Sequence, residues 1–288
     1  MATSSRECIG PYRRLNVIRT TKASEIVEVL HDAKGQRLAI KLLQPAYVHD
    51  KSEIALLKHE YAVGRTLKHP SIIRIDQCHC NHDLAYMVME YFPAPNLKQI
   101  IQRGAQRIAH LTMPILRQAT ESLGYLHQQG WIHRDVKPDN FLVSDEGELK
   151  LIDFALAQRP KGSLARLLGG RGKIQGTRSY MSPEQIQGGA IDVRADIYSL
   201  GCVIHELLSG KPPFTAASSS ELLNKHLKLP PPSLLTSDAN LTKPFAQLVL
   251  RMLEKKADQR PGSMAELLLA LDGVRVYHNP PRPPADNN

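Results

Sequence analysis

The sequence predicts an α+β fold in which a small part rich in strands precedes a larger part made mostly of helices. Between residues 12 and 91, apolar residues alternate in several short segments and follow helical spacing in only one. From Asn96 onward, helical patterns dominate. Because 288 residues are enough for two lobes with a sizeable core, we expect a bilobal chain.

We expect four segments along the chain. An N-terminal extension occupies residues 1–11, the strand-rich lobe occupies 12–91, and the helical lobe occupies 92–276. The last segment, 277–288, is rich in proline and offers few apolar anchors. We therefore expect this tail to be disordered.

The strand-rich lobe begins with a predicted hairpin. Residues 27–30 and 37–43 alternate apolar and polar side chains around a short turn. Residues 51–67 carry apolar side chains at mostly helical spacing, which predicts the single helix of this lobe. Two more strands are predicted at 72–79 and 85–91.

The helical lobe contains one strongly amphipathic segment, residues 113–129, with Thr112 as its expected N-cap. Residues 195–209 are apolar on most faces, so this helix should be buried. Gly210 and the prolines behind it end that helix. Three further helices are predicted at 219–228, 243–255 and 264–274.

The composition excludes several classes of protein. No apolar run is long enough to span a bilayer, so we expect no membrane span. Few and scattered cysteines suit a reducing compartment, and we expect a cytoplasmic protein. The net charge of +9 is compatible with an anionic partner, but no segment has the pattern of a nucleic-acid module. We therefore expect no nucleic acid partner and a basic surface that accommodates nucleotide phosphates.

The segment His133-Arg134-Asp135-Val136-Lys137-Pro138-Asp139-Asn140 resembles the catalytic loop of the eukaryotic-type (Hanks-type) serine/threonine protein kinases. The resemblance implies that Asp135 accepts the proton of the attacking hydroxyl. It also implies that Lys137 neutralises charge on the transferring phosphate and that Asn140 holds a metal ion.

Other motifs follow in the order of that family, from residue 12 to residue 274. Leu38-Ala39-Ile40-Lys41 resembles the third kinase strand with its Lys, and Glu60 follows in the predicted helix. Asp153 stands where the family keeps the Asp of its Asp-Phe-Gly motif, the main magnesium ligand. Segments 176–184 and 192–201 resemble the substrate-facing loop and the start of the central helix, most like the bacterial members.

The resemblance implies a bilobal kinase fold, and ATP and Mg²⁺, or Mn²⁺ in its place, as cofactors. Lys41 would contact the α- and β-phosphates and pair with Glu60. Around the adenine, the resemblance implies that Met89 guards the back of the pocket and that the backbone at Glu90 and Phe92 bonds the base. Ile26, Ala39 and Leu142 would sandwich the base, although ordinary core positions explain these three residues equally well.

Lys137 and Thr177 stand where Ser/Thr-type kinases carry these residue types, so the resemblance implies transfer to serine or threonine of a protein substrate. It further implies a buried ion pair between Glu184 and Arg260, and a brace from Asp196 to the backbone of the catalytic loop. We interpret these last three residues as structural supports.

The chain departs from the family in its phosphate-covering loop. The three family glycines would fall near Arg19, Thr21 and Ser24, yet residues 18–26 contain no glycine. Glycine lets backbone N–H groups approach phosphates closely, so tight ATP binding is in question. Either the charge of Arg19 or Lys22 compensates for the missing glycines, or both side chains are only solvated. In addition, Ala155 replaces the glycine after Asp153-Phe154.

The segment 156–175 contains one hydroxyl, Ser163, and no acidic residue. Many kinases carry an activating phosphate at the position of Lys173, where Arg134 would face a second cation. We hypothesise that this chain lacks that activation and that an anionic or protein regulator binds the basic residues Arg166, Arg171 and Lys173. Separately, the spacing of Cys78 and Cys80 matches no common zinc site.

The favoured function is an ATP-dependent serine/threonine protein kinase with an atypical, glycine-free phosphate loop. The alternative is a pseudokinase, a scaffold or binding module with weak or no phosphotransfer, which the glycine-free loop supports. A small-molecule phosphotransferase of related fold is a third reading, which segment 176–184 and the helix at Asp196 argue against.

Overall fold

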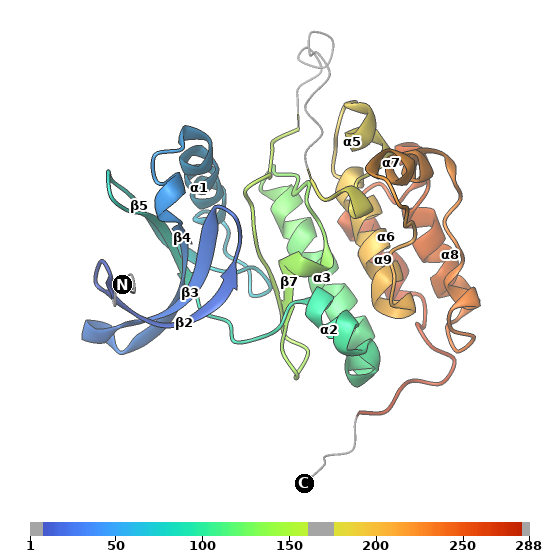
Figure 1. Cartoon of the computed structure of the whole chain (residues 1–288). Coiled ribbons are helices and arrows are strands. Elements are labelled where there is room, and N and C mark those ends of the chain that lie inside the picture. The colour runs from blue at the N-terminus through green and yellow to red at the C-terminus, as the bar shows by residue number, and fades with distance from the viewer. Residues whose placement is uncertain (1–7, 161–175, 284–288) are drawn as a thin grey trace. The chain divides into compact units, whose positions relative to one another are not determined.

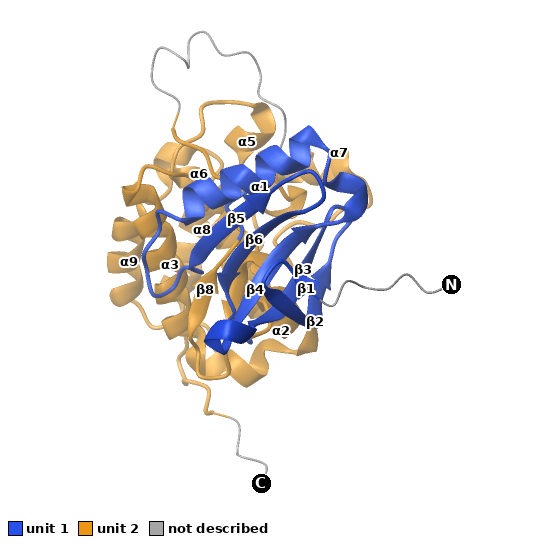
Figure 2. Cartoon of the chain, turned by 90° about the vertical axis from the view of Figure 1, so that its left-hand side faces the viewer, with its two compact units in different colours: residues 1–93, 153–155 blue, residues 94–152, 156–288 orange. Residues whose placement is uncertain are grey.

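The computed structural model describes residues 8–160 and 176–283 and has the predicted α+β architecture (Figure 1). The chain forms two compact units, which Figure 2 colours separately. Unit 1 contains residues 1–93 together with 153–155, and unit 2 contains 94–152 and 156–288. Each unit is described below by itself.

Unit 1 is built on one antiparallel sheet with the strand order β1-β2-β3-β4-β6-β5. Apolar alternation sends one set of side chains into a core made mainly of Val27, Val29, Leu38, Ile40 and Val88. Helix α1 packs on β5 and β6. The elements are β1 (Cys8–Ile9), β2 (Tyr12–Thr20), β3 (Ser24–His31), β4 (Gln36–Leu43), α1 (Lys51–Gly64), β5 (Ile75–Cys80) and β6 (Ala85–Glu90).

Helix α1 shows how local sequence sets the limits of an element. Asp50 is its N-cap and accepts hydrogen bonds from the N–H groups of Ser52 and Glu53. The predicted helix extends to residue 67, but α1 ends at Gly64. Gly64 also lies close against strand β5, because a Cβ there would lie 2.3 Å from Cδ1 of Ile75.

Unit 2 is mostly helical, with a small hairpin of β7 and β8. Its central helix α6 is buried along nearly its whole length, as its apolar sequence predicts, and contacts α2 and α8. Helix α3 packs against α9. The elements are α2 (Leu97–Arg103), α3 (Thr112–Gln128), β7 (Phe141–Val143), β8 (Leu149–Leu151), α5 (Pro183–Gln187), α6 (Arg194–Ser209), α7 (Ser219–Lys228), α8 (Lys243–Met252) and α9 (Met264–Asp272).

Three further local predictions need correction. Thr112 is the first residue of α3 and bonds back to the carbonyl of Ala109, so Leu111 occupies the N-cap position instead. Helix α8 ends at Met252, three residues earlier than predicted. The tail differs from the expected disorder at its start, because the hydroxyl of Tyr277 bonds to Thr112 and the N–H of His278 to the carbonyl of Asn240.

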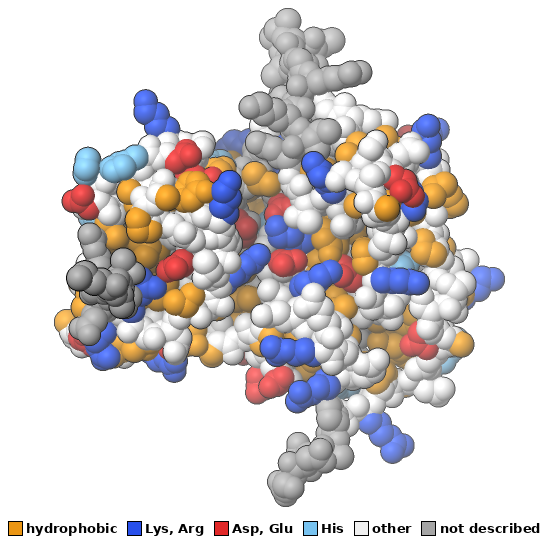
Figure 3. All heavy atoms as spheres, viewed as in Figure 1, with side chains coloured by type: hydrophobic (Ala, Val, Ile, Leu, Met, Phe, Trp, Pro, Cys, Tyr) orange, Lys and Arg blue, Asp and Glu red, His pale blue; other side chains and the backbone are white. Residues whose placement is uncertain are grey.

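No helix in the described ranges 8–160 and 176–283 is long and apolar enough to cross a membrane. On the face drawn in Figure 3, Lys and Arg side chains are scattered and acidic side chains lie among them. On this face, the coloured Lys and Arg side chains therefore do not gather in one patch.

Candidate active site

The centre of the site in unit 2 is a triangle of Asp135, Lys137 and Thr177. The N–H and hydroxyl of Thr177 donate to Oδ1 of Asp135 at 2.9 and 3.0 Å. The Nζ of Lys137 donates to Oδ2 of Asp135 and, at 3.2 Å, to the hydroxyl of Thr177. Both carboxylate oxygens of Asp135 are thus held in place by donors from two separate segments of the chain.

The backbone in front of Asp135 is held by a buried carboxylate. Asp196, the third residue of α6, accepts the N–H groups of His133 at 2.8 Å and of Arg134 at 2.9 Å, as predicted. His127 at the end of α3 lies 2.8 Å from the same carboxylate. Although burial alone raises the pKa of Asp196, the contact with His127 and these backbone bonds bring it below its ordinary value.

Arg134 itself has a φ of +67°, in the left-handed region that an L-residue seldom adopts. The two bonds from the N–H groups of His133 and Arg134 to Asp196 offset the strain. The turn presents the next side chain, Asp135, to the Thr177 segment.

Gly176 makes that approach of the Thr177 segment feasible. Its φ is +116°, and a Cβ there would lie 3.0 Å from the carbonyl oxygen of Arg134. The same carbonyl accepts Nε2 of Gln185 at 2.9 Å. Gln185 also closes the N-terminus of α5 in a capping box with Ser182.

Asn140 is buried at the end of a 3₁₀ turn, Pro138–Asn140. Its Nδ2 donates to the carbonyl of Asp135 at 2.9 Å, which fixes the amide so that Oδ1 points the other way. A fixed amide oxygen is a suitable ligand for a hard cation such as Mg²⁺.

In unit 1, strand β4 and helix α1 bring Lys41 and Glu60 together, as predicted. The Nζ of Lys41 lies 2.5 Å from Oε2 of Glu60, and both side chains are largely buried. Burial by itself lowers the pKa of Lys41, but the carboxylates of Glu60 and Asp153 raise it above its usual value. Lys41 therefore stays a cation beside two carboxylates.

Asp153 has a φ of +67°, and its Oδ1 accepts the N–H of Ala155 at 3.3 Å. Ala155 has no positive φ, so the alanine fits this conformation without strain. Phe154 is fully buried, and its ring lies next to Gly64 of α1. Carboxylate oxygens of Asp153 and the amide oxygen of Asn140 are the hard donors that Mg²⁺ prefers, so the residues fit this metal.

The expected adenine-binding residues of unit 1 share one face of the sheet. Ala39 is paired with Met89, and Lys41 is paired with both Ile26 and Met87. Because paired residues of adjacent strands lie on the same face, these side chains stand opposite the core set. Glu90 and Phe92 follow at the end of β6, where the N–H of Glu90 donates to the carbonyl of Arg74 and the side-chain Oε2 of Glu90 accepts the N–H of Arg74. Leu142 lies on β7 of unit 2, half-buried between the buried Phe141 and Val143.

A comparison with known protein families decides what these residues belong to. Residues 12–270 match the model of the protein kinase domain. The chain belongs to the protein kinase family. The match covers both units and every motif described above.

Among similar proteins, the kinase chain is 32% identical to the serine/threonine-protein kinase PknB of Mycobacterium tuberculosis over 260 residues, which are 88% of this chain and 41% of PknB. It is 31% identical to the probable serine/threonine-protein kinase SCO3848 of Streptomyces coelicolor over 255 residues, 85% of this chain and 38% of that protein. The chain therefore spans about four tenths of the length of these relatives.

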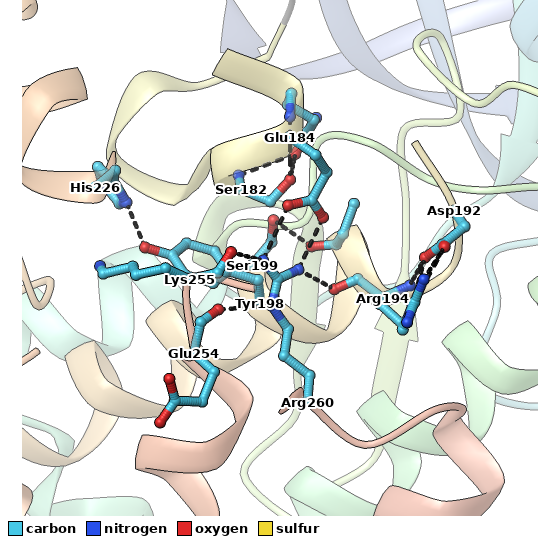
Figure 4. A network of polar contacts seen from close by, with 12 residues as sticks. Ser182, Glu184, Asp192, Arg194, Tyr198, Ser199, His226, Glu254, Lys255 and Arg260 are labelled. Carbon is cyan, nitrogen blue, oxygen red and sulfur yellow. Dashed lines mark hydrogen bonds and ion pairs between the residues drawn. The ribbon is translucent and has the colours of Figure 1, made fainter. Parts of the chain in front are cut away.

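The large-lobe support of the kinase is the network of Figure 4. Nη1 and Nη2 of Arg260 donate to the two oxygens of Glu184 at 2.8 and 2.9 Å, which confirms the predicted ion pair. Arg260 also donates to the carbonyls of Arg194, Glu254 and Lys255. Its guanidinium lies against the ring of Tyr198, so α5, α6 and the segment after α8 are joined at one buried side chain.

Two other supporting residues of the kinase, Glu206 and Glu28, were not predicted from the sequence. Glu206 of α6 is buried and binds the hydroxyl of Tyr180 at 2.6 Å and Nζ of Lys98 at 2.5 Å. Glu28 of β3 is buried on the Ala39 face and binds Asn16 and Arg37. A single acidic residue in an apolar stretch is the only trace that these two carboxylates leave in the sequence.

Two further expectations concern the basic segment before Gly176 and the cysteines of β5. Ser163, Arg166, Arg171 and Lys173 lie outside them, so the regulator hypothesis stays a prediction. Within the described part, Nη1 of Arg134 donates to Oε1 of Gln158 at 2.7 Å, so its observed partner is a neutral amide. Cys78 and Cys80 have their sulfur atoms 3.8 Å apart, but no group of three or more metal-ligating side chains gathers within residues 8–160 and 176–283.

Proposed function

We propose that the chain is an ATP-dependent serine/threonine protein kinase that transfers the γ-phosphate to a serine or threonine hydroxyl of a protein substrate. The observation that supports this most directly is the double anchoring of Asp135. Its Oδ1 is held by Thr177 and its Oδ2 by Lys137, so the carboxylate is positioned before any substrate arrives. The names of the bacterial relatives support the same activity.

In the proposed reaction, the substrate hydroxyl donates its proton to Asp135 as its oxygen forms a bond to the γ-phosphorus. The bond between that phosphorus and the β,γ-bridging oxygen breaks, and ADP leaves. Lys137 offsets negative charge on the transferring group, because its ammonium already lies beside Asp135. Lys41, oriented by Glu60, binds the α- and β-phosphates.

We propose Asn140 and Asp153 as the ligands of Mg²⁺, or of Mn²⁺ in its place. When bound, the metal offsets charge on the phosphate oxygens. For the base, we propose the face that carries Ile26, Ala39 and Met89, the backbone at Glu90 and Phe92, and Leu142 of the other unit. Residues 12–91 and 92–276 would act as the two lobes.

Regulation and location are also proposals. The neutral contact of Arg134 with Gln158 is in keeping with a kinase that does without the common activating phosphate. We propose that an anionic or protein regulator binds at Arg166, Arg171 and Lys173. We also propose that the chain has no nucleic acid partner and that it acts in the cytoplasm.

The test is transfer of labelled γ-phosphate from ATP, with Mg²⁺ or Mn²⁺, to the chain itself and to a generic Ser/Thr protein. An Asp135→Asn variant runs beside it, because Asn keeps the shape but cannot take the proton. We expect transfer in the parent chain and its loss in the variant. Equal signals in both, under both metals, would refute the kinase proposal and favour the pseudokinase scaffold.

A further inference from the structure

The row of residues that contains Lys41 extends across three strands of the unit 1 sheet to Arg19. Arg19 of β2 is paired with Ile26 of β3, and Ile26 is paired with Lys41 of β4. Paired residues of neighbouring antiparallel strands point to the same face, so the side chains of Arg19 and Lys41 stand on one face. Their backbones are two strand spacings apart, about 10 Å, which two long cationic side chains can span.

A bulge in β2 is what turns Arg19 to this face. The register runs from Val17 opposite Val27 to Arg19 opposite Ile26, so Ile18 is an extra residue in β2. Without that bulge, Ile18 would face Ile26 and Arg19 would point to the opposite side of the sheet. Bulges commonly re-aim a side chain next to an active site.

The turn after Arg19 is held by hydrogen bonds among its own polar groups. The N–H of Thr21 donates to the carbonyl of Ser24 at 2.8 Å, and the N–H of Ser24 donates to Oγ1 of Thr21 at 3.0 Å. The side chain of Gln44 donates to the carbonyl of Thr21 at 2.6 Å. No residue of this turn has a positive φ, so the turn forms without glycine. Two of the N–H groups that a glycine-rich loop would offer to a phosphate are therefore already engaged.

The electrostatics around Lys41 agree with this placement. Burial lowers the pKa of Lys41 and the carboxylates of Glu60 and Asp153 raise it, while the guanidinium of Arg19 opposes those carboxylates. Arg19 is thus near enough to act on the same charge as Glu60 and Asp153. Two cations whose fields overlap on one face form a site for a polyanion.

We propose that Arg19 is a phosphate-binding residue for the nucleotide and supplies through its side chain the charge that the glycine-free turn cannot supply through backbone N–H groups. The inference rests on the proposed function, because it concerns the ATP site of the same kinase. The ligand class is a nucleoside di- or triphosphate. Lys22, at the exposed tip of the turn, has no such place in the row and should contribute little.

The experiment measures equilibrium binding of adenosine, AMP, ADP and ATP, without any transfer step, to the parent chain and to Arg19→Met, Arg19→Lys and Lys22→Met. Arg19→Met should weaken ATP and ADP binding about tenfold, the usual scale of one charge-assisted hydrogen bond, and leave adenosine unchanged. Arg19→Lys should recover part of the loss, and Lys22→Met, which removes the same charge from the same loop, should stay within about twofold.

Three results would overturn the inference. In the first, Arg19→Met binds ATP as the parent does. In the second, Arg19→Met and Lys22→Met lose ATP affinity equally, which would indicate only general charge attraction. In the third, Arg19→Met loses adenosine as well, which would indicate a disturbed turn. Failure of the proposed function has a different signature, namely ATP binding without any transfer that depends on Asp135.

Discussion

The two carboxylate oxygens of Glu184 each accept a hydrogen bond from one guanidinium nitrogen of Arg260, at 2.8 and 2.9 Å, although the residues are 76 positions apart in the chain. Arg260 is buried and gives its remaining donors to three backbone carbonyls. This one side chain therefore joins α5 to the central helix α6 and to the segment after α8.

Replacing Arg260 should destabilise the chain strongly. Arg260→Met leaves the carboxylate of Glu184 and three carbonyls without their donors, so we expect a loss of about 3 to 5 kcal/mol in the free energy of unfolding. Urea unfolding followed by circular dichroism measures it. The matched control is Arg251→Met, which breaks an exposed ion pair with Glu266 and should cost at most about 1 kcal/mol. Equal losses in the two variants would contradict the role given to burial.

Thr177 should affect the rate more than substrate binding. Thr177→Val removes the hydroxyl that links Asp135 to Lys137 but keeps the backbone N–H bond to Oδ1. We expect kcat to fall about tenfold, with the KM for ATP changed less than about twofold, because the base and the ammonium lose their alignment. Thr177→Ser restores the hydroxyl and should restore most of kcat. A variant in which KM alone changes would show that Thr177 acts in binding instead.

Acid should destabilise unit 2 through His226. Burial, and then Lys255, lower the pKa of His226 to about 4, and its Nδ1 lies 2.9 Å from the hydroxyl of Tyr198. Above about pH 6.5 the imidazole is neutral in both states; below it only the unfolded chain takes up the proton. Stability should therefore fall between about pH 6.5 and 4, by roughly 1 to 3 kcal/mol.

The measurement is the free energy of unfolding at half-unit steps of pH. His226→Asn, which keeps a polar atom toward Tyr198, should flatten the decline in that window. His82→Asn removes an exposed histidine and should leave the profile unchanged. Lys255, whose pKa burial lowers to about 8, titrates above the window and does not obscure the result. An identical decline in His226→Asn and in the parent would rule out His226 as its source.

Gly64 should tolerate no side chain where α1 meets β5. In Gly64→Ala, the new Cβ would lie 2.3 Å from Cδ1 of Ile75 and 3.3 Å from the ring of Phe154. We expect a loss of about 1 to 3 kcal/mol in unfolding free energy from this overpacking. Adding Ile75→Val removes the clashing methyl and should recover much of the loss.

The control for Gly64 is Gly273→Ala, where a Cβ meets nothing closer than 3.7 Å and φ is −83°. This variant should be neutral or more stable by up to about 1 kcal/mol, because it restricts the unfolded chain. If Gly64→Ala were equally neutral, the contact between its new Cβ and Ile75 would not limit the packing of α1 on β5.

Much of the fold was predictable because the pattern is local. Apolar alternation predicts β3 and β4, and the uniformly apolar stretch before Gly210 predicts the buried helix α6. Helix ends were harder, since the turn after α1 and the end of α8 depend on packing as well as on capping residues. Short elements such as α5 have too few residues for a periodic pattern.

The sequence by itself determined the α+β class and the types and order of the residues that we propose as catalytic, because spacing within a motif is a property of the chain alone. The resemblance likewise sufficed to predict that Lys41 pairs with Glu60 and Glu184 with Arg260. Only the tertiary structure decided which neighbours hold those groups in place. Glu206 binds Lys98, 108 positions away, and a single-residue bulge turns Arg19 toward Lys41. Such relationships depend on register and on contacts between distant segments, which no local pattern encodes.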